Sequence, residues 1–318
     1  MMRAAALSVG GLDPCSGAGL GADLRAFELA GVWGCAVCAA LTEQSTQGVR
    51  AVHPVRTAIV AAQIQVLLAD VAVRAIKTGA LGSPSNVRYL AHALAPTLTG
   101  APLIVDPVLL PTATLGPAQP AAGRAPSLSG ARSLAALRDL AAVATLLTPN
   151  IPEAQALLGT TLRSAAHARD AAMALLDLGP AAVLLKGGHF GADVPGQRGS
   201  VVDWLATSDG VEPLRHRWID TGGDVHGTGC MLASLIAGRL AACAGPVLDR
   251  AAHPARPSKS ARSSRGPSAG CSRSQVRAAC VWAVGRLGRM LRSPVHIGHG
   301  LAVLGGRAAT ARVRGRAP

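Results

Sequence analysis

Five consecutive residues, His226-Gly227-Thr228-Gly229-Cys230, directly precede a long apolar run that is typical of a helix. Glycines at a helix start let the backbone approach a ligand, and the free N–H groups and the helix dipole attract an anion. We therefore interpret Gly227, Thr228 and Gly229 as an anion hole, suited to a phosphoryl group. The same field would favour the thiolate of Cys230, a candidate proton acceptor for a substrate hydroxyl. Taken alone, Gly-Thr-Gly is more often only a tight turn.

Two carboxylates and a lysine have the right types to hold a cation and phosphates. Asn150 lies at a turn, and Glu153 lies in the first turn of a helix that a proline opens. Glu153 and Asp106 are candidate ligands of Mg²⁺, which prefers a few carboxylates and several waters near phosphates. Lys186, before two glycines, can reach a nucleotide phosphate. Two alternatives stay open, because Asn150 and Glu153 also match a capping box and a lone lysine at a strand end is usually solvated.

Apolar strands alternate with helical runs along the chain. The patterns predict strands at 4–10, 34–41, 75–77, 103–105, 145–148 and 182–186, and helices at 22–30, 58–69, 85–94, 152–158, 165–178 and 231–242. This alternation predicts an α/β fold with a largely parallel sheet and helices on both faces. Ligands bind beyond the carboxyl ends of such strands, and Asp13, Asp106, Asn150 and Lys186 fall at or soon after these ends.

The positive charge is confined to one part of the chain. The formal net charge is +14, but residues 250–318 hold fourteen Arg and Lys and no acidic residue, so the other 17 basic residues balance the 17 acidic ones. We expect a single domain over 1–318, with surface insertions at 112–133 and 249–274 and a disordered basic tail at 306–318. A solvated tail of this composition does not lead us to expect a nucleic-acid partner.

Several classes of protein are disfavoured by the composition. Apolar stretches fall far short of the roughly 18 to 20 residues that a membrane-spanning helix needs. The first residues lack the pattern of a signal peptide, so we expect a cytoplasmic protein. Seven scattered cysteines do not suggest a disulfide framework. Cys35 and Cys38 lie in a predicted buried strand and are interpreted as packing residues, and we expect no structural metal.

The motifs, taken together and in order, resemble one known family. They are Gly11-Leu12-Asp13-Pro14, Ser16-Gly17-Ala18-Gly19, Ala22-Asp23-Leu24, Thr42-Glu43-Gln44-Ser45-Thr46, Lys77-Thr78-Gly79, Asp106-Pro107-Val108, Thr148-Pro149-Asn150-Ile151-Pro152-Glu153-Ala154, Lys186-Gly187-Gly188-His189, His226-Gly227-Thr228-Gly229-Cys230 and Ile297-Gly298-His299-Gly300. This set is similar to the hydroxymethylpyrimidine/phosphomethylpyrimidine kinases of the ribokinase-like superfamily. The resemblance spans residues 5–304, interrupted by the two insertions.

The resemblance implies a reaction and roles for residues. It implies ATP- and Mg²⁺-dependent phosphorylation of the hydroxymethyl group of 4-amino-5-hydroxymethyl-2-methylpyrimidine, and of its monophosphate, in thiamine biosynthesis. Gln44 would bind the aminopyrimidine, since an amide donates and accepts at once; Gly11 and Asp13 would line the same pocket. Asn150 and Glu153 would organise Mg²⁺ and the nucleotide phosphates. Cys230 would be the base, where sugar kinases of the superfamily carry an aspartate.

Three departures from the family pattern leave other readings open. The segment 111–116 lacks the Lys-Ser-Gly of a covering loop, Ala80 replaces a usual methionine of the substrate pocket, and Gly21 replaces a usual glutamine. A wider pocket would suit a pyridoxal kinase, and an altered loop would suit a catalytically weak pyrimidine-binding paralogue. The composition fits a homodimer as well as a monomer.

Overall fold

A nine-stranded sheet forms the centre of the protein in this computed structural model, which describes residues 3–98, 100–109, 131–188, 199–243 and 271–305. The sheet order is β3-β2-β1-β4-β5-β6-β7-β8-β9. Strands β2, β1, β4, β5, β6 and β7 run parallel, whereas β3, β8 and β9 pair antiparallel with their neighbours. The strands are β1 Ala5–Leu12, β2 Trp33–Ser45, β3 Gly48–Pro54, β4 Val73–Thr78, β5 Leu103–Val105, β6 Leu146–Leu147, β7 Ala182–Leu185, β8 Ser200–Thr207 and β9 Gly210–Arg217.

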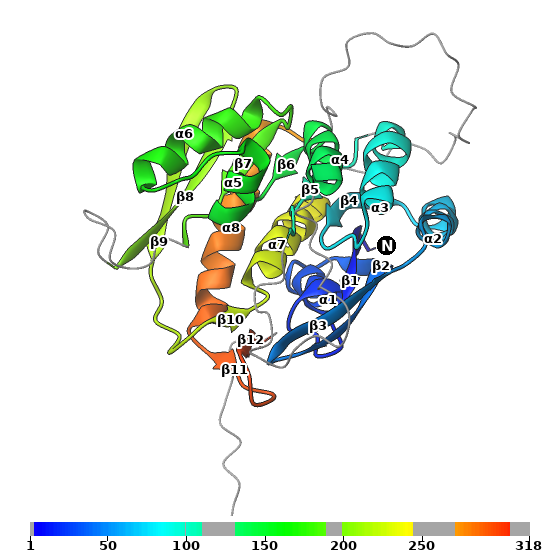
Figure 1. Ribbon diagram of the computed structural model, residues 1–318, viewed down its shortest axis with the longest axis horizontal. Coiled ribbons are helices and arrows are strands. Elements are labelled where there is room, and N and C mark those ends of the chain that lie inside the picture. The colour runs from blue at the N-terminus through cyan, green and yellow to red at the C-terminus, as the bar shows by residue number, and fades with distance from the viewer. Residues whose placement is uncertain (1–2, 99, 110–130, 189–198, 244–270, 306–318) are drawn as a thin grey trace, which may run out of the picture.

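Helices cover both faces of this sheet (Figure 1). One layer packs on a buried cluster with β1, β4, β5 and β7; it holds α2 Thr57–Asp70, α3 Pro84–Arg88, a π-helical turn Tyr89–Leu94, a 3₁₀ turn Ala95–Thr97, α4 Ala131–Ala142, α5 Ile151–Leu158 and α6 Ala165–Leu176. The other layer holds α1 Gly19–Leu29, α7 Thr228–Cys243 and α8 Arg273–Leu291, with its own buried cluster. The parallel strands are therefore covered on both sides, as their apolar composition requires.

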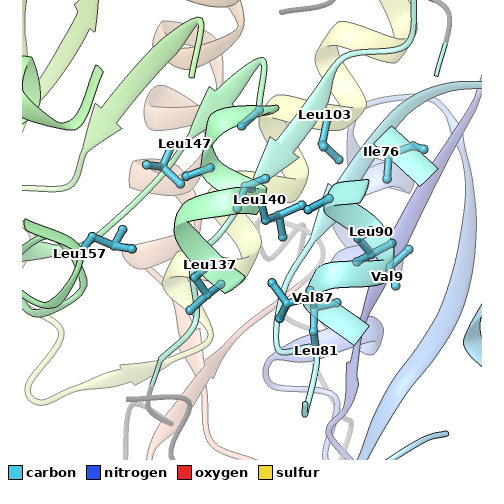
Figure 2. Close-up of a cluster of buried hydrophobic side chains, with 14 of the residues drawn as sticks. Val9, Ile76, Leu81, Val87, Leu90, Leu103, Leu137, Leu140, Leu147 and Leu157 are labelled. Carbon is cyan, nitrogen blue, oxygen red and sulfur yellow. The ribbon is translucent and has the colours of Figure 1, made fainter. Parts of the chain in front are cut away.

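Small aliphatic side chains fill the space between the layers. Figure 2 shows Val9, Ile76, Leu103 and Leu147 from the parallel strands facing Leu140 of α4. Alanines such as Ala141 and Ala172 are fully or nearly fully buried. With only 2% aromatic residues, the core depends on this close packing of helix against sheet.

A second, small sheet lies beside the end of the main one. Strands β10 Val225–His226, β12 Ala302–Leu304 and β11 Pro294–Val295 form it in that order, with β10 parallel to β12. The predicted closing motif contacts the turn between β2 and β3, because the backbone N–H of Gly300 donates to Thr46 Oγ1 at 3.2 Å. The pairing of β10 with β12 holds the short strand that ends at His226.

The α/β prediction is confirmed, with corrections to its details. Strand β2 extends to Ser45, so Gln44 belongs to a strand, and the antiparallel pairs β2–β3 and β8–β9 were not predicted. The two predicted insertions lie mostly outside the described residues. Their last residues belong to helices, because α4 begins at Ala131 and α8 begins at Arg273. The predicted tail at 306–318 lies wholly outside the described residues. Among the residues described, no helix is long and apolar enough to cross a bilayer.

Candidate active site

The loop after β1 is organised around the carboxylate of Asp13. Asp13 accepts hydrogen bonds from the backbone N–H groups of Cys15 at 3.0 Å and Ala18 at 2.8 Å, and from the thiol of Cys15 at 3.0 Å. Nε2 of His226 lies 3.1 Å from Oδ2 of Asp13. Burial works to raise the pKa of Asp13, but the hydrogen bonds from His226, Cys15 and the backbone outweigh it and hold the pKa below its usual range. Asp13 is therefore an ionised anchor at neutral pH.

Gln44 lies at the far end of β2 and faces the same histidine. Its amide nitrogen position is 2.8 Å from Nε2 of His226, and its amide oxygen position is 3.2 Å from Oγ1 of Thr42. A side chain at Gly11 would meet Ala80 at 3.5 Å, so Gly11 and Ala80 are neighbours. The structure thus brings the predicted substrate residues to one region and places Ala80, the residue that departs from the family pattern, beside Gly11.

The anion hole begins α7, and close backbone packing explains its glycines. Gly227 has φ +82° and a Cβ there would overlap the carbonyl oxygen of Gly17. A Cβ on Gly229 would lie 3.2 Å from Nζ of Lys186. The first helical hydrogen bond runs from the N–H of Met231 to the carbonyl of Gly227, so the preceding first-turn N–H groups have no partner within the helix. A phosphoryl group here would meet helix N–H groups and the ammonium of Lys186.

The predicted preference of Cys230 for its thiolate is wrong in this structure. Burial raises the pKa of Cys230 to about 11, helped by the carboxylates of Asp106 and Asp23. The ammonium of Lys77 and the backbone of Gly19 oppose this rise without cancelling it. The residue as a whole is half-buried and directly follows Gly229, so its position suits a proton acceptor. In the structure as it stands, however, Cys230 is a neutral thiol at pH 7.

A second charged group lies at the ends of β5, β6 and β7. Nζ of Lys186 is 3.0 Å from Oδ1 of Asp106 and 4.0 Å from Oε2 of Glu153. Asn150 and Glu153 form a capping box, with the Asn150 N–H to Glu153 Oε2 and the Glu153 N–H to Asn150 Oδ1 both 2.8 Å. The capping box that was the alternative interpretation of this pair is therefore present, and Asn150 and Glu153 still lie beside Lys186. Burial raises the pKa of Glu153 to about 7, with Asp106 acting in the same direction against Lys186.

Lys77 and Asp23 form a fully buried ion pair for which the sequence predicted no role. Nζ of Lys77 lies 3.0 and 2.9 Å from the two carboxylate oxygens of Asp23. The hydroxyls of Ser8 and Ser234 donate to the same carboxylate at 2.6 and 2.7 Å. This network joins β1, α1, β4 and α7. Lys77, directly after the buried Ala75 and Ile76 of β4, was the signal that could have identified it.

All the predicted site residues thus meet at the carboxyl ends of the parallel strands. Gly11, Asp13 and Gln44 line one end, Asp106, Asn150, Glu153 and Lys186 the other, and Gly227, Thr228, Gly229 and Cys230 lie between them. His226, next to Gly227, contacts Gln44 and Asp13, and the Nζ atom of Lys186 lies beside Gly229. Of the Lys-Gly-Gly-His motif, His189 lies outside the described residues.

An α/β kinase is the class that this fold and this site define. The phosphomethylpyrimidine kinase family matches residues 13–256. The chain belongs to that family and is a phosphotransferase. It is 38% identical over 236 residues to the hydroxymethylpyrimidine/phosphomethylpyrimidine kinase of Synechococcus elongatus, covering 74% of this chain and 83% of that protein.

A longer relative and a solved structure extend the comparison. The chain is 38% identical over 242 residues to the thiamine biosynthesis bifunctional protein ThiED of Geobacter sulfurreducens, matching 75% of this chain but only 45% of that protein. Its fold is similar to the pyridoxal kinase of Staphylococcus aureus, with a TM-score of 0.74, 20% identity, and coverage of 98% and 96% of the two chains. At that identity the likeness shows the ribokinase-like fold alone.

Proposed function

We propose that this protein transfers the γ-phosphoryl group of ATP to the hydroxymethyl oxygen of 4-amino-5-hydroxymethyl-2-methylpyrimidine, as a step of thiamine biosynthesis. The observation that carries the proposal is the contact of Gln44 with His226, which places an amide suited to an aminopyrimidine edge next to the anion hole. The relatives named as hydroxymethylpyrimidine/phosphomethylpyrimidine kinases support the same substrate. The monophosphate product would be the substrate of a second phosphorylation at the same site.

The residues of the chain would divide the work as follows. Gln44 and the loop of Asp13 hold the pyrimidine so that its hydroxymethyl oxygen points at the start of α7. The first-turn N–H groups of α7 and the ammonium of Lys186 stabilise the negative charge that spreads over the transferring group. Cys230, as the thiolate, accepts the proton of the attacking hydroxyl. Because this thiolate is the minor form at pH 7, we expect the chemical step to accelerate as the pH rises.

The donor set fits Mg²⁺. Asp106 and Glu153 both lie near the ammonium of Lys186. Burial and the carboxylate of Asp106 raise the pKa of Glu153, and the charge of Lys186 does not cancel this rise. Oxygen ligands of this kind suit Mg²⁺ near phosphates. When bound, the ion would neutralise charge on the β- and γ-phosphates. Asp106, Glu153 and, through its cap, Asn150 would hold it.

Pyridoxal is the second candidate substrate, because Ala80 beside Gly11 leaves more space than a methionine would. ADP release by the full-length protein, measured in parallel with the two alcohols, tests the choice. We expect a higher kcat/KM for the pyrimidine and a loss of that preference in Gln44→Leu, with Gln65→Leu, a change of an exposed glutamine on α2, as the matched control. A higher kcat/KM for pyridoxal would overturn the proposal, and binding of the pyrimidine without turnover would favour the weak paralogue.

A further inference from the structure

The imidazole of His226 occupies a fixed position between two site residues. Its Nε2 atom is 3.1 Å from Oδ2 of Asp13 and 2.8 Å from the amide nitrogen position of Gln44. The ring is buried, and a Cβ on Gly17 would lie 2.6 Å from its Cδ2, so the ring packs directly on that glycine. Pairing of β10 with β12 fixes its backbone. One nitrogen thus serves two polar neighbours with little freedom to move.

The hydrogen-bonding partners of His226 decide whether Nε2 of its ring carries a proton. If Nε2 of His226 were an acceptor for the Gln44 amide, it would face the carboxylate of Asp13, which is also an acceptor, at 3.1 Å. Although each acceptor has another donor, their lone pairs would repel each other at a buried site. A proton on Nε2 removes this conflict, because the imidazole then donates to Asp13.

The same proton decides how the Gln44 amide must be turned. The single N–H at Nε2 is shared between Asp13 and Gln44, so the amide oxygen of Gln44 must face His226 and the amide nitrogen must face Thr42. The nitrogen and oxygen of an amide are distinguished by their hydrogen bonds. Thr42 agrees with this orientation: its hydroxyl proton is already directed to the carbonyl of Leu12 at 2.8 Å, so its oxygen can accept from the Gln44 nitrogen at 3.2 Å. Every donor in the chain of contacts then meets an acceptor.

We propose that His226, held by Asp13, is a specificity-determining positioning residue that locks the Gln44 amide in one orientation toward the substrate ring. The locked amide presents one remaining N–H and one remaining oxygen lone pair in a fixed order. A ring nitrogen next to an amino group needs that pair in that order. Pyridoxal has no amino group next to its ring nitrogen, so its ring edge cannot engage the N–H and the oxygen of the amide together in that order. The inference rests on the proposed function, because it assumes that Gln44 reads the substrate.

Kinetics of two His226 variants test the proposal. His226→Leu frees the amide to rotate, so we expect KM for the pyrimidine to rise about 10- to 100-fold, as for a lost buried hydrogen-bond network. The change in kcat and the change in KM for pyridoxal should be several-fold smaller. His226→Gln, whose terminal nitrogen can donate to both Asp13 and Gln44, should restore most of the preference for the pyrimidine. A proportional loss with both alcohols, or no rescue by His226→Gln, would overturn the proposal.

The imidazole tautomer provides a test that needs no turnover. In uniformly ¹⁵N-labelled full-length protein, long-range ¹H–¹⁵N spectra identify which ring nitrogen carries the proton, and comparison with His226→Gln assigns the signals. We expect His226 to carry its proton on Nε2. A proton on Nδ1 alone would overturn the proposal. Because this result is independent of catalysis, it stands apart from a failure of the proposed function, which would appear as absence of turnover on the pyrimidine by the wild type.

Discussion

The buried pair of Lys77 and Asp23 should be a main determinant of stability, and Lys77→Met is the perturbation that reveals it. Both side chains are fully buried, and Nζ lies 2.9 Å from Oδ2. Burial works to lower the pKa of Lys77, but the charge of Asp23 outweighs it and raises the pKa above its usual value. Lys77 is therefore charged throughout the neutral range, and its replacement by methionine leaves the buried carboxyl group of Asp23 without its cation.

The magnitude follows from the partners that remain. Removing one member of a buried ion pair costs about 3–5 kcal/mol. Ser8 and Ser234 would still donate to Asp23, so we expect the lower part of that range, about 3–4 kcal/mol. With a dependence of roughly 3 kcal/mol per molar urea, the unfolding midpoint should fall by about 1 M. Asp23→Asn should cost a similar amount, and the double variant should cost less than the sum of the two.

Urea unfolding followed by circular dichroism measures these differences. The matched control is Arg3→Met, which breaks the exposed pair of Arg3 with Glu28 at 3.0 Å. Such exposed pairs contribute less than about 1 kcal/mol. If Lys77→Met shifted the midpoint no more than Arg3→Met, or if the two single changes were additive, the network would not stabilise the fold in the way argued.

Three further predictions concern the site. Gly21→Ala should lower the melting temperature, because the added Cβ would overlap the side chain of Ser16 and lie 2.9 Å from its Cα. Adding Ser16→Gly should recover part of the loss, since it removes that side chain and Ser16 has φ +56°; equal melting temperatures of the wild type and Gly21→Ala would contradict this. Alkylation of Cys230 by iodoacetamide, followed by peptide mass spectrometry, should accelerate about tenfold per pH unit from pH 7 to 10, since the pKa is about 11; a plateau below pH 9 would show a lower pKa. Asn150→Ala should cost about 1–2 kcal/mol through the lost cap and weaken ATP binding, and calorimetry showing neither effect would refute its role.

The sequence predicted where the site residues lie because strand ends can be recognised locally. Apolar segments before Asp106, Asn150 and Lys186 marked the ends of three parallel strands, and all parallel strands deliver these ends to one edge of the sheet. The glycines of the anion hole were also readable, since Gly227 needs a positive φ and close backbone approach. These features depend on short stretches of chain.

Features that depend on distant pairing could not be predicted in the same way. Strands β10 and β12 have two and three residues, too few for a periodic pattern. They pair Val225 with Ala302, which lies 77 positions later in the chain, a separation that local patterns cannot reveal. The pKa of Cys230 required the balance between burial and Lys77, which is set by the packing of α7 on β4. The antiparallel pair β8–β9 likewise became visible only in the sheet.

Gly21 shows how a departure from a family pattern is explained by one contact. The sequence indicated only that a usual glutamine is missing. The structure shows the side chain of Ser16 in the space that a Cβ at position 21 would need. The two positions therefore depend on each other, and neither could be interpreted alone.

Identification of the phosphorylated product tests the account most directly. Full-length protein, ATP, Mg²⁺ and 4-amino-5-hydroxymethyl-2-methylpyrimidine would be incubated, and the product followed by mass spectrometry for the wild type and for Cys230→Ala. The account predicts the pyrimidine monophosphate from the wild type and a rate about 10²- to 10⁴-fold lower from Cys230→Ala, the usual contribution of a positioned base. Absence of the monophosphate with folded wild type would contradict the proposed function, and an unchanged rate in Cys230→Ala would contradict the role of the thiol.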